Sequence, residues 1–269
     1  MKIQYASAAI GVLVDAPAGI AALSEAASQA RTVIDVYVEV DVGAHRCGVA
    51  PGVPALALAQ AIVRAPGLRF RGMQAYQGAA QHLREPEARR AAIAGAAADA
   101  RRTRESIVAA GIACDLVTGA GTGTWQLERD SGVYDELQPG SYVFMDADYG
   151  RNTAAASELH FEQSLYVLAS VMSVPAAERA IVDAGLKAFS FDSGLPLVHG
   201  RAGAEYVKAS DEHGVLRVRA DAPPVAQGER VWLIPGHCDP TVNLYDWIVA
   251  VRSGVVEGVW PIEARGALG

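Results

Sequence analysis

The chain changes its pattern near its middle, and this change constrains the fold more than any other feature of the sequence. Between residue 10 and about residue 150, short apolar runs alternate with longer segments of helical periodicity. Such alternation is typical of a parallel sheet whose strands are joined by helices. From about Glu158 onward, short strand-like runs follow one another with little more than turns between them. This second pattern predicts an antiparallel β-domain.

The two patterns predict individual elements and a boundary between two domains. In the first half, strands are expected over residues 10–14, 33–42, 69–76, 114–118 and 141–145, and helices over residues 17–30, 54–64 and 85–110. In the second half, strands are expected over residues 165–174, 180–183, 206–210, 215–218, 230–234 and 247–251. We therefore expect one domain over residues 1–155 and another over residues 156–269. Five strand-helix units are too few to close a barrel, which needs eight units and about 250 residues.

Charge and cysteine content exclude several classes of function. The chain has 23 basic and 30 acidic residues and a formal net charge of −7, which argues against nucleic acid as its main partner. Its three cysteines form no Cys-x-x-Cys pair, so we expect no disulfide framework and a cytoplasmic location. No uncharged stretch approaches the roughly 20 residues that a membrane helix needs, so no membrane partner is expected.

A His-x-Asp pair near the C-terminus is the first candidate site. His237 and Asp239 follow the predicted strand at residues 230–234 and a Pro-Gly turn. In an extended conformation, residues two apart point to the same side of the chain. Imidazole and carboxylate suit a divalent metal such as Mn²⁺, Mg²⁺ or Zn²⁺, and two protein ligands would leave room for water or substrate. The alternative is a turn in which both side chains cap backbone groups.

A glycine-rich segment in the first half is the second candidate site. Residues 118–124 leave a predicted strand, and backbone N–H groups in such a loop can bind a phosphate. Gly121, Thr122 and Gly123 are the candidates there, and Ser141, at the start of the last predicted strand of this half, is a second phosphate candidate. Glycines also serve tight turns, and Ser141 is equally compatible with a simple hydroxyl at a strand start.

Several motifs together resemble the D-threonine aldolase family, which is related to the D-serine dehydratases and built like alanine racemase. These motifs occur along the whole chain in the same order as in that family. The segments are Val38-Glu39-Val40-Asp41-Val42-Gly43, Arg46-Cys47-Gly48-Val49, Gln74-Ala75-Tyr76, Thr118-Gly119-Ala120-Gly121-Thr122-Gly123, Leu137-Gln138-Pro139-Gly140-Ser141-Tyr142, Asp183-Ala184-Gly185, Pro235-Gly236-His237-Cys238-Asp239 and Val256-Glu257-Gly258-Val259-Trp260.

The resemblance implies a fold and two cofactors. The fold would be α/β, with about the last five units of a partial (β/α)8 TIM-type barrel followed by an antiparallel β-domain. Roughly three barrel units, on the order of 100 residues, would be absent, so the chain is expected to be truncated at its N-terminus. The cofactors implied are pyridoxal 5'-phosphate (PLP) and a divalent metal, and a homodimer is the implied assembly.

The resemblance also gives the single residues roles. Arg46 would face the pyridine nitrogen of PLP, and Tyr76 would flank the cofactor. Gly121, Thr122, Gly123 and Ser141 would bind its phosphate. His237 and Asp239 would hold the metal, and His82 would remove a proton from the β-hydroxyl of the substrate.

Three functions stay open at this stage. The first is a lyase that cleaves D-3-hydroxy amino acids to glycine and an aldehyde. The second is a D-serine dehydratase, which uses the same scaffold. Related dehydratases tend to place Cys where Asp239 stands, so Asp239 favours the lyase, although Cys238 lies alongside. The third is an inactive fragment, because the Pro-His-x-Lys-type segment that carries the PLP lysine of the family is missing. Lys187 could be considered for that lysine, but it lies in the predicted β-domain, whereas the PLP lysine of the family ends the first barrel strand.

Overall fold

The computed structural model describes residues 10–155 and 159–266. Their contacts divide the chain into two compact units. Within the described residues, unit 1 comprises residues 10–140 and 152–155, and unit 2 comprises residues 141–151 and 159–266. The segment Ser141–Arg151, which the sequence analysis assigned to the first domain, thus makes its contacts within unit 2.

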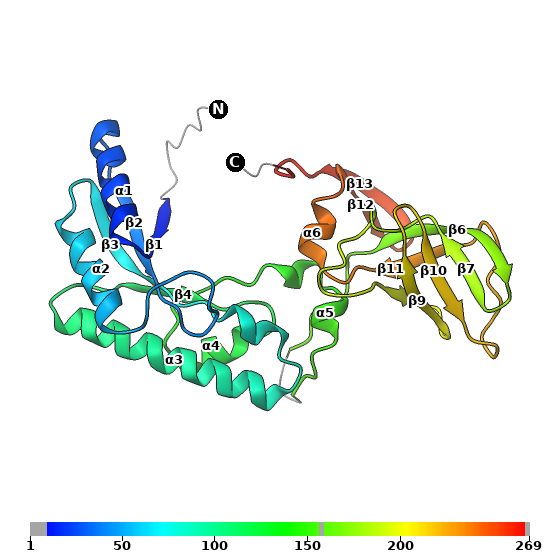
Figure 1. Ribbon diagram of the computed structural model, residues 1–269, viewed down its shortest axis with the longest axis horizontal. Coiled ribbons are helices and arrows are strands. Elements are labelled where there is room, and N and C mark those ends of the chain that lie inside the picture. Colours follow the sequence, from blue (N-terminus) through cyan, green and yellow to red (C-terminus); the bar gives the residue numbers. More distant parts are fainter. Residues whose placement is uncertain (1–9, 156–158, 267–269) are drawn as a thin grey trace. The chain divides into compact units, whose positions relative to one another are not determined.

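Unit 1 is a parallel five-stranded sheet in the order β1-β2-β3-β4-β5 with its helices alongside (Figure 1). The parallel α/β fold class predicted from the sequence is confirmed. The strands are β1 (Gly11–Val14), β2 (Ile34–Glu39), β3 (Leu68–Gln74), β4 (Leu116–Gly119) and β5 (Glu136–Leu137). The helices are α1 (Pro17–Ala30), α2 (Val53–Arg64), the 3-10 helix η1 (Gly78–His82), α3 (Pro86–Ala109) and α4 (Trp125–Ser131).

Local sequence explains why these elements form. Each of α1, α2 and α3 has a proline in its first turn. Backbone N–H groups in the first turn make no hydrogen bond within the helix, so a proline, which lacks this N–H, fits there. Val36 and Val38 of β2 are fully buried, as expected for a strand of a parallel sheet. In such a sheet all strands end at the same edge, so residues that follow β2, β3 and β4 are brought to one side of unit 1.

The fifth strand lies elsewhere than predicted. Residues 141–145 do not form a strand, because Ser141–Val143 is a 3-10 turn, η2, in which the N–H groups of Phe144 and Met145 donate to the Ser141 carbonyl. The apolar run there suggested a buried strand, yet Tyr142 and Val143 are exposed. The strand that pairs with β4 is the two-residue β5, which is too short to show a periodicity.

Unit 2 is antiparallel, as predicted, with a six-stranded sheet in the order β8-β11-β6-β7-β10-β9 and a separate hairpin of β12 and β13. Two of its strands, β8 and β13, were not predicted. The elements are η2, α5 (Ala147–Gly150), β6 (Val167–Ala176), β7 (Arg179–Val182), β8 (Leu197–His199), β9 (Ala204–Ala209), β10 (Gly214–Val218), β11 (Arg230–Ile234), α6 (Cys238–Val242), β12 (Trp247–Arg252) and β13 (Val255–Pro261).

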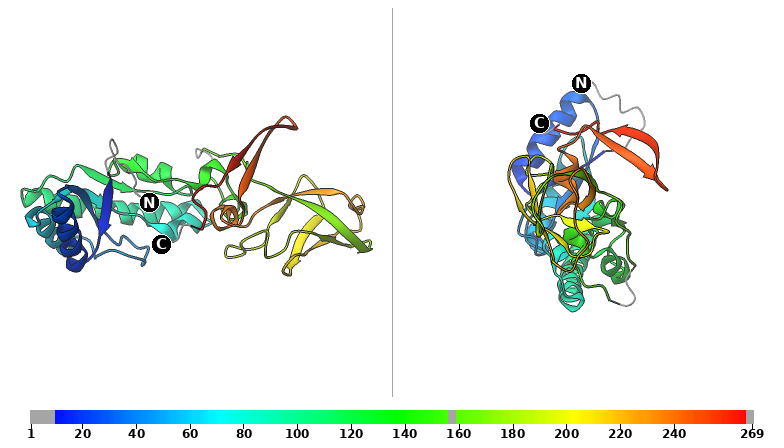
Figure 2. Two further views of the ribbon diagram at one scale, coloured as in Figure 1. Left: turned by 90° about the horizontal axis from the view of Figure 1, so that it is seen from above. Right: turned by 90° about the vertical axis from the view of Figure 1, so that its right-hand side faces the viewer.

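The β12-β13 hairpin stands off from the six-stranded sheet (Figure 2). Most of its apolar side chains are exposed, including Trp247 and Trp260, which are 58% and 60% exposed. Between the hairpin and the sheet lies a half-open cavity of about 720 Å³, lined by aromatic side chains such as Tyr166 and Trp232. Among residues 10–155 and 159–266, no helix combines the length and apolar character that crossing a membrane requires.

Candidate functional site

Arg46 and Tyr76 meet at the edge of unit 1 where the parallel strands end. Arg46 follows β2 and Tyr76 follows β3, and the guanidinium carbon of Arg46 lies 5.5 Å from the centroid of the Tyr76 ring. A cation over an aromatic face at this distance is attracted to it. The backbone of His45, directly before Arg46, has a φ of 52°, a conformation that non-glycine residues rarely adopt. The structure therefore places two predicted cofactor-binding residues side by side.

A buried carboxylate that the sequence analysis did not single out lies close to this pair. Glu39, the last residue of β2, is 6% exposed, and its Oε1 accepts a hydrogen bond from Gln74 Nε2 at 3.3 Å. Among the described residues, its Oε2 has no partner. Burial raises the pKa of Glu39, and the Gln74 hydrogen bond and the charge of Arg46 oppose that rise. Arg46 is thus in the electrostatic reach of a buried acid.

The glycine-rich loop packs onto Gln81, which is fully buried. Gln81 Oε1 accepts a hydrogen bond from the Gly123 N–H at 2.9 Å, and Gln81 Nε2 donates to Thr124 Oγ1 at 2.7 Å. A Cβ added to Gly121 would lie 2.5 Å from Gln81 Oε1, so a side chain there would displace the Gln81 amide. Ala120 in the same loop has a φ of 69°. The loop is therefore tightly built, and the N–H of Gly123 is engaged within the protein.

Glu128 of α4 extends this network beneath the loop. Thr124 Oγ1 donates to Glu128 Oε1 at 2.8 Å, and Glu128 is 1% exposed. Burial raises the pKa of Glu128 to about 7, against a lowering by the Thr124 hydrogen bond. A side chain this buried gave no signal in the sequence, because Glu in a short helix is usually exposed.

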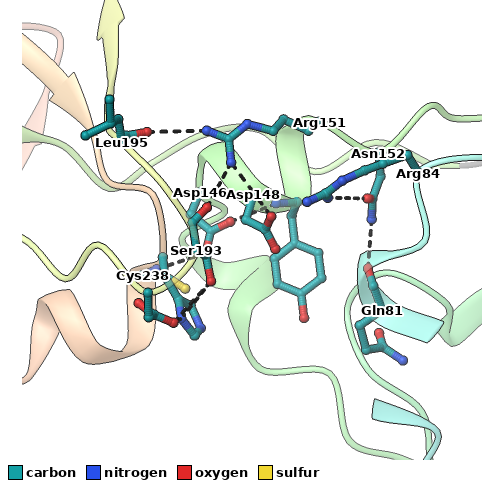
Figure 3. A network of polar contacts seen from close by, with 12 residues as sticks. Gln81, Arg84, Asp146, Asp148, Arg151, Asn152, Ser193, Leu195 and Cys238 are labelled. Atoms are coloured by element: carbon teal, nitrogen blue, oxygen red, sulfur yellow. Dashed lines mark hydrogen bonds and ion pairs between the residues drawn. The ribbon is translucent and has the colours of Figure 1, made fainter. Parts of the chain in front are cut away.

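His82 is the last residue of η1 and is exposed, while its neighbour Gln81 points inward. Asn152 helps to hold this segment of unit 1 (Figure 3): its Nδ2 donates to the Gln81 carbonyl at 2.9 Å, and its Oδ1 accepts from Arg84 Nη1 at 2.7 Å. His82 is therefore carried on an anchored turn, one residue from the support of the glycine-rich loop.

In unit 2 the His-x-Asp pair does not have the predicted extended conformation. His237 is the residue before α6, and Asp239 lies in the first turn of that helix. His237 itself has an extended backbone, but Asp239 is helical, so the alternation of a strand does not align the two side chains. Among the described residues, no group of three or more His, Cys, Asp or Glu side chains could hold a metal ion. A metal here would have at most two protein ligands.

The His237 ring is held by the loop that precedes β8. Its Nδ1 lies 2.6 Å from Asp192 Oδ2, which also accepts a hydrogen bond from Ser193 Oγ at 3.1 Å. Ser190 Oγ donates to the other oxygen, Asp192 Oδ1, at 2.6 Å. Burial opposes ionisation of Asp192, but hydrogen bonds from Ser190, His237 and Ser193 lower its pKa to about 2. Asp192, which the sequence analysis missed, is therefore ionised under ordinary conditions.

The backbone around His237 is fixed by buried groups, several of which appear in Figure 3. Asp146, 1% exposed, accepts the Cys238 N–H at Oδ2 and the Tyr149 N–H at Oδ1, at 2.8 Å and 2.9 Å. Arg151 Nη1 donates to the Ser193 carbonyl at 3.0 Å. The turn before His237 is thus tied to the segment Ser141–Arg151 of its own unit.

Cys238 is fully buried between His237 and Asp239. Burial and the charge of Asp146 raise the pKa of its thiol to about 12, while a hydrogen bond with Ser141 opposes the rise. Ser141, the second predicted phosphate residue, is thus placed in the 3-10 turn η2 of unit 2, and its hydroxyl contacts this thiol. Asp239, by contrast, is exposed. Of the two candidate ligands that follow His237, only Asp239 is accessible.

Lys187 does not have the surroundings of a Schiff-base lysine. Its ammonium pairs with Glu212 on the surface of unit 2, and the hydrogen bond and charge of Glu212 raise its pKa. A raised pKa keeps the amine protonated, whereas a nucleophilic lysine needs a lowered one. The described part of unit 1 contains no lysine.

Family models match both parts of the chain. The model described as "Alanine racemase, N-terminal domain" matches residues 2–148, and the model described as "Putative serine dehydratase domain" matches residues 164–251. The chain is 46% identical over 269 residues to a 3-hydroxy-D-aspartate aldolase of Paracoccus denitrificans, covering 98% of this chain and 69% of the relative. It is 49% identical over 263 residues to a D-threonine aldolase of an Arthrobacter species, covering 96% and 68%.

Solved structures agree with these matches. A crystal structure of D-threonine aldolase from Filomicrobium marinum superimposes with a TM-score of 0.95 at 44% identity, covering 97% of this chain and 71% of that one. D-threo-3-hydroxyaspartate dehydratase from Delftia superimposes with a TM-score of 0.77 at 28% identity, covering 93% and 71%. The chain is thus more similar to these aldolases than to this dehydratase.

Proposed function

The chain belongs to the D-threonine aldolase and D-serine dehydratase-like family with the alanine racemase fold, and from this premise we propose that it is a PLP- and divalent-metal-dependent aldolase. Its homologues act on D-3-hydroxy amino acids, as their names state, and the proposed reaction cleaves such substrates to glycine and an aldehyde. The observation that carries the choice of reaction is the exposed Asp239 beside the half-buried His237, with Cys238 buried between them.

The residues of unit 1 fit a bound PLP. The Arg46 guanidinium lies over the Tyr76 ring, and the buried Glu39 is within its electrostatic influence. A cation and an aromatic face together suit the PLP pyridine ring, which is aromatic and carries polar groups. Gly121 and Thr122 lie in a glycine-rich loop after β4, and backbone N–H groups of such a loop can bind a phosphate. PLP, when bound, supplies the electron sink that takes up the electrons of the broken Cα–Cβ bond. Arg46 and Tyr76 would orient its ring, and the loop would bind its phosphate.

The residues of unit 2 fit a divalent metal. His237 Nδ1 is occupied by Asp192, so Nε2 is the nitrogen left for coordination, and the Asp239 carboxylate is accessible. A divalent metal would polarise the β-hydroxyl of the substrate and lower its pKa. His82, which is exposed, would accept the hydroxyl proton as a general base.

The assay that tests the reaction compares D-threonine with D-serine, using the chain supplied with PLP and Mn²⁺. We expect glycine and acetaldehyde from D-threonine and little pyruvate from D-serine. An excess of pyruvate would favour the dehydratase instead. A chain that binds PLP and Mn²⁺ but turns over neither substrate would favour the third function, a binding-only fragment, to which the absence of lysine from the described part of unit 1 also points.

We also propose that the chain forms a homodimer in the cytoplasm. The exposed apolar hairpin of β12 and β13 supports an interface, because contiguous exposed apolar surfaces mark interaction sites. All three cysteines are unpaired, which suits a reducing compartment. Light scattering after size-exclusion chromatography tests the assembly, and Trp260→Ser should shift a dimer toward monomer.

A further inference from the structure

Asp192 of unit 2 is not among the residues to which the sequence assigns a role. Its carboxylate accepts three side-chain hydrogen bonds, from Ser190 at Oδ1 and from Ser193 and His237 at Oδ2. The contact between His237 Nδ1 and Asp192 Oδ2 is 2.6 Å long, a close hydrogen bond between a ring nitrogen and a carboxylate. Among the described residues, no group bonds to the other ring nitrogen of His237, Nε2.

We propose that Asp192 is a positioning residue that orients His237 for metal binding, an inference that rests on the proposed function. The Asp192 oxygen lies 2.6 Å from Nδ1, a distance at which Nδ1 donates a hydrogen to the carboxylate, so Asp192 keeps the ring hydrogen on Nδ1. Nε2 then carries the lone pair that a divalent metal requires. Partners of this kind fix both the tautomer and the ring orientation of metal-binding histidines.

The loop that carries Asp192 is fastened on two sides. The Ser190 N–H donates to Thr241 Oγ1 at 3.1 Å, which ties the loop to α6 one turn beyond His237. On the other side, the guanidinium of Arg151 donates to the carbonyls of Ser193 and Leu195 at 3.0 Å and 3.3 Å. Asp192 is thus held in place by its own loop, and its contact with His237 does not depend on a mobile side chain alone.

Gly236 shows how closely the two segments approach each other. A Cβ at Gly236 would lie 2.2 Å from the Gly194 carbonyl oxygen, so a side chain there would push the 194 turn away from His237. The Pro-Gly pair before His237 therefore serves this approach as well as the change of chain direction. The short distance between Asp192 and His237 follows from backbone geometry that only glycine permits.

Asp192 acts through His237 and not as a ligand itself. Both of its oxygens already accept hydrogen bonds, Oδ1 from Ser190 and Oδ2 from His237 and Ser193. The described residues contain no three-membered group of potential metal ligands, which agrees with a supporting position for Asp192. Its loss should therefore weaken a metal site without removing a ligand.

The test measures Mn²⁺ binding to the 269-residue chain by calorimetry and by the EPR signal of free Mn²⁺. We expect Asp192→Ala to weaken Mn²⁺ binding by about 10- to 100-fold, the usual effect of losing such a partner. Asp192→Asn should lose less, because its amide oxygen can still accept from Nδ1–H. Asp221→Ala is the matched control: Asp221 forms a surface pair with Arg219 in the same unit, and Mn²⁺ binding should not change.

A second measurement reads the histidine ring directly. In the metal-free chain, ¹⁵N NMR of labelled histidine should show His237 with its hydrogen on Nδ1, assigned by the loss of its signals in His237→Gln. Asp192→Ala should shift this signal toward the Nε2–H tautomer, whereas Asp192→Asn should retain the wild-type tautomer. Circular dichroism checks that each variant is folded. If Asp192→Ala folds poorly, the His237 tautomer in the wild type and in Asp192→Asn tests the proposal instead.

The outcomes separate the inference from the proposed function. If Asp192→Ala bound Mn²⁺ with the wild-type affinity and kept the wild-type His237 tautomer, the role of Asp192 would be overturned and the metal site would stand. A wild-type chain with the Nε2–H tautomer of His237 would overturn that role in the same way. If neither His237→Ala nor Asp239→Ala weakened Mn²⁺ binding, or if the wild-type chain bound no Mn²⁺, the metal assignment in the proposed function would fail, and the role of Asp192 with it.

Discussion

The glycine-rich loop of unit 1 and the His237 turn of unit 2 both depend on a polar side chain that supports them, but the two supports differ in exposure. Gln81 beneath the loop is fully buried, and Glu128 behind it is 1% exposed. Asp192 beside His237 has a side chain that is 49% exposed. Water can replace a lost partner at an exposed group and not at a buried one. The loop support should therefore matter for folding, and the His237 support for ligand binding.

The largest expected effect comes from Gln81→Ala. This change leaves the partly buried Gly123 N–H without its acceptor and opens a cavity at the fully buried Gln81 side chain, so the free energy of unfolding should fall by about 3 kcal/mol. Urea denaturation followed by circular dichroism measures it. Gln29→Ala is the control, because the exposed Gln29 side chain bonds Glu25 on α1 and should change stability by less than about 0.5 kcal/mol. Equal effects of the two changes would remove the contrast between buried and exposed supports.

The pH dependence of stability should reveal Glu128. Its pKa in the folded chain is raised to about 7 from an ordinary value of 4.5, so the folded state favours the protonated acid. The stabilisation is complete below pH 4.5 and is lost as pH rises through 7, by about 3 kcal/mol at most. Urea denaturation of wild type and Glu128→Gln at pH 5 and pH 8 checks this. The glutamine variant should lose this part of the pH dependence, and a wild type more stable at pH 8 would contradict the assignment.

Asp239→Ala tests whether the two regions act separately. Removal of the exposed carboxylate that we propose as a metal ligand should weaken Mn²⁺ binding at least tenfold, or about 1.4 kcal/mol, and reduce aldolase activity. The PLP absorbance band should stay, because Arg46, Tyr76 and the glycine-rich loop lie in unit 1 and Asp239 in unit 2. Titration with Mn²⁺ and an absorbance spectrum of the same sample supply both readings. Loss of the PLP band would mean that the metal turn maintains the fold.

Gly95→Ala should give the smallest effect and one of opposite sign. Gly95 lies within α3, and a Cβ there would meet no atom within 4 Å. Alanine in a helix interior is more favourable than glycine, so the free energy of unfolding should rise by about 0.5–1 kcal/mol. Gly121→Ala, whose Cβ would collide with Gln81, should lower it. Two changes of the same sign would show that close contact with Gln81 is not what the loop glycines provide.

The sequence was sufficient for elements whose pattern is long and local. The helix Pro17–Ala30 was predicted to the residue, and the strand Arg230–Ile234 likewise, because apolar periodicity and proline or glycine boundaries fix them. The strand expected over residues 141–145 was wrong, since an exposed apolar turn and a buried strand have the same composition over five residues. The two-residue strand Glu136–Leu137 carries no period at all.

The candidate site divides in the same way. Motif order in the sequence identified Arg46, Tyr76, His82, the glycine-rich loop, His237 and Asp239 as candidates, and the comparisons show the family those motifs belong to. Glu39, Gln81, Glu128 and Asp192 were not found, because nothing in their sequence neighbourhood distinguishes a buried or bonded side chain from a solvated one. One hydrogen-bond partner of each of Glu39, Gln81 and Asp192 lies between 35 and 45 residues away in the sequence.

By itself, therefore, the sequence determined the α/β and antiparallel halves, the family, and which types of residue are available for chemistry, since these depend on local pattern. Tertiary structure decided which of those residues are accessible and what holds them. It buried Cys238 and exposed Asp239, one position apart, because the first turn of α6 directs consecutive side chains about 100° apart and Asp146 holds the Cys238 N–H on the inner side. Burial and long-range hydrogen bonds depend on which segments, distant in the sequence, come together in the folded chain. A local sequence pattern does not contain that information.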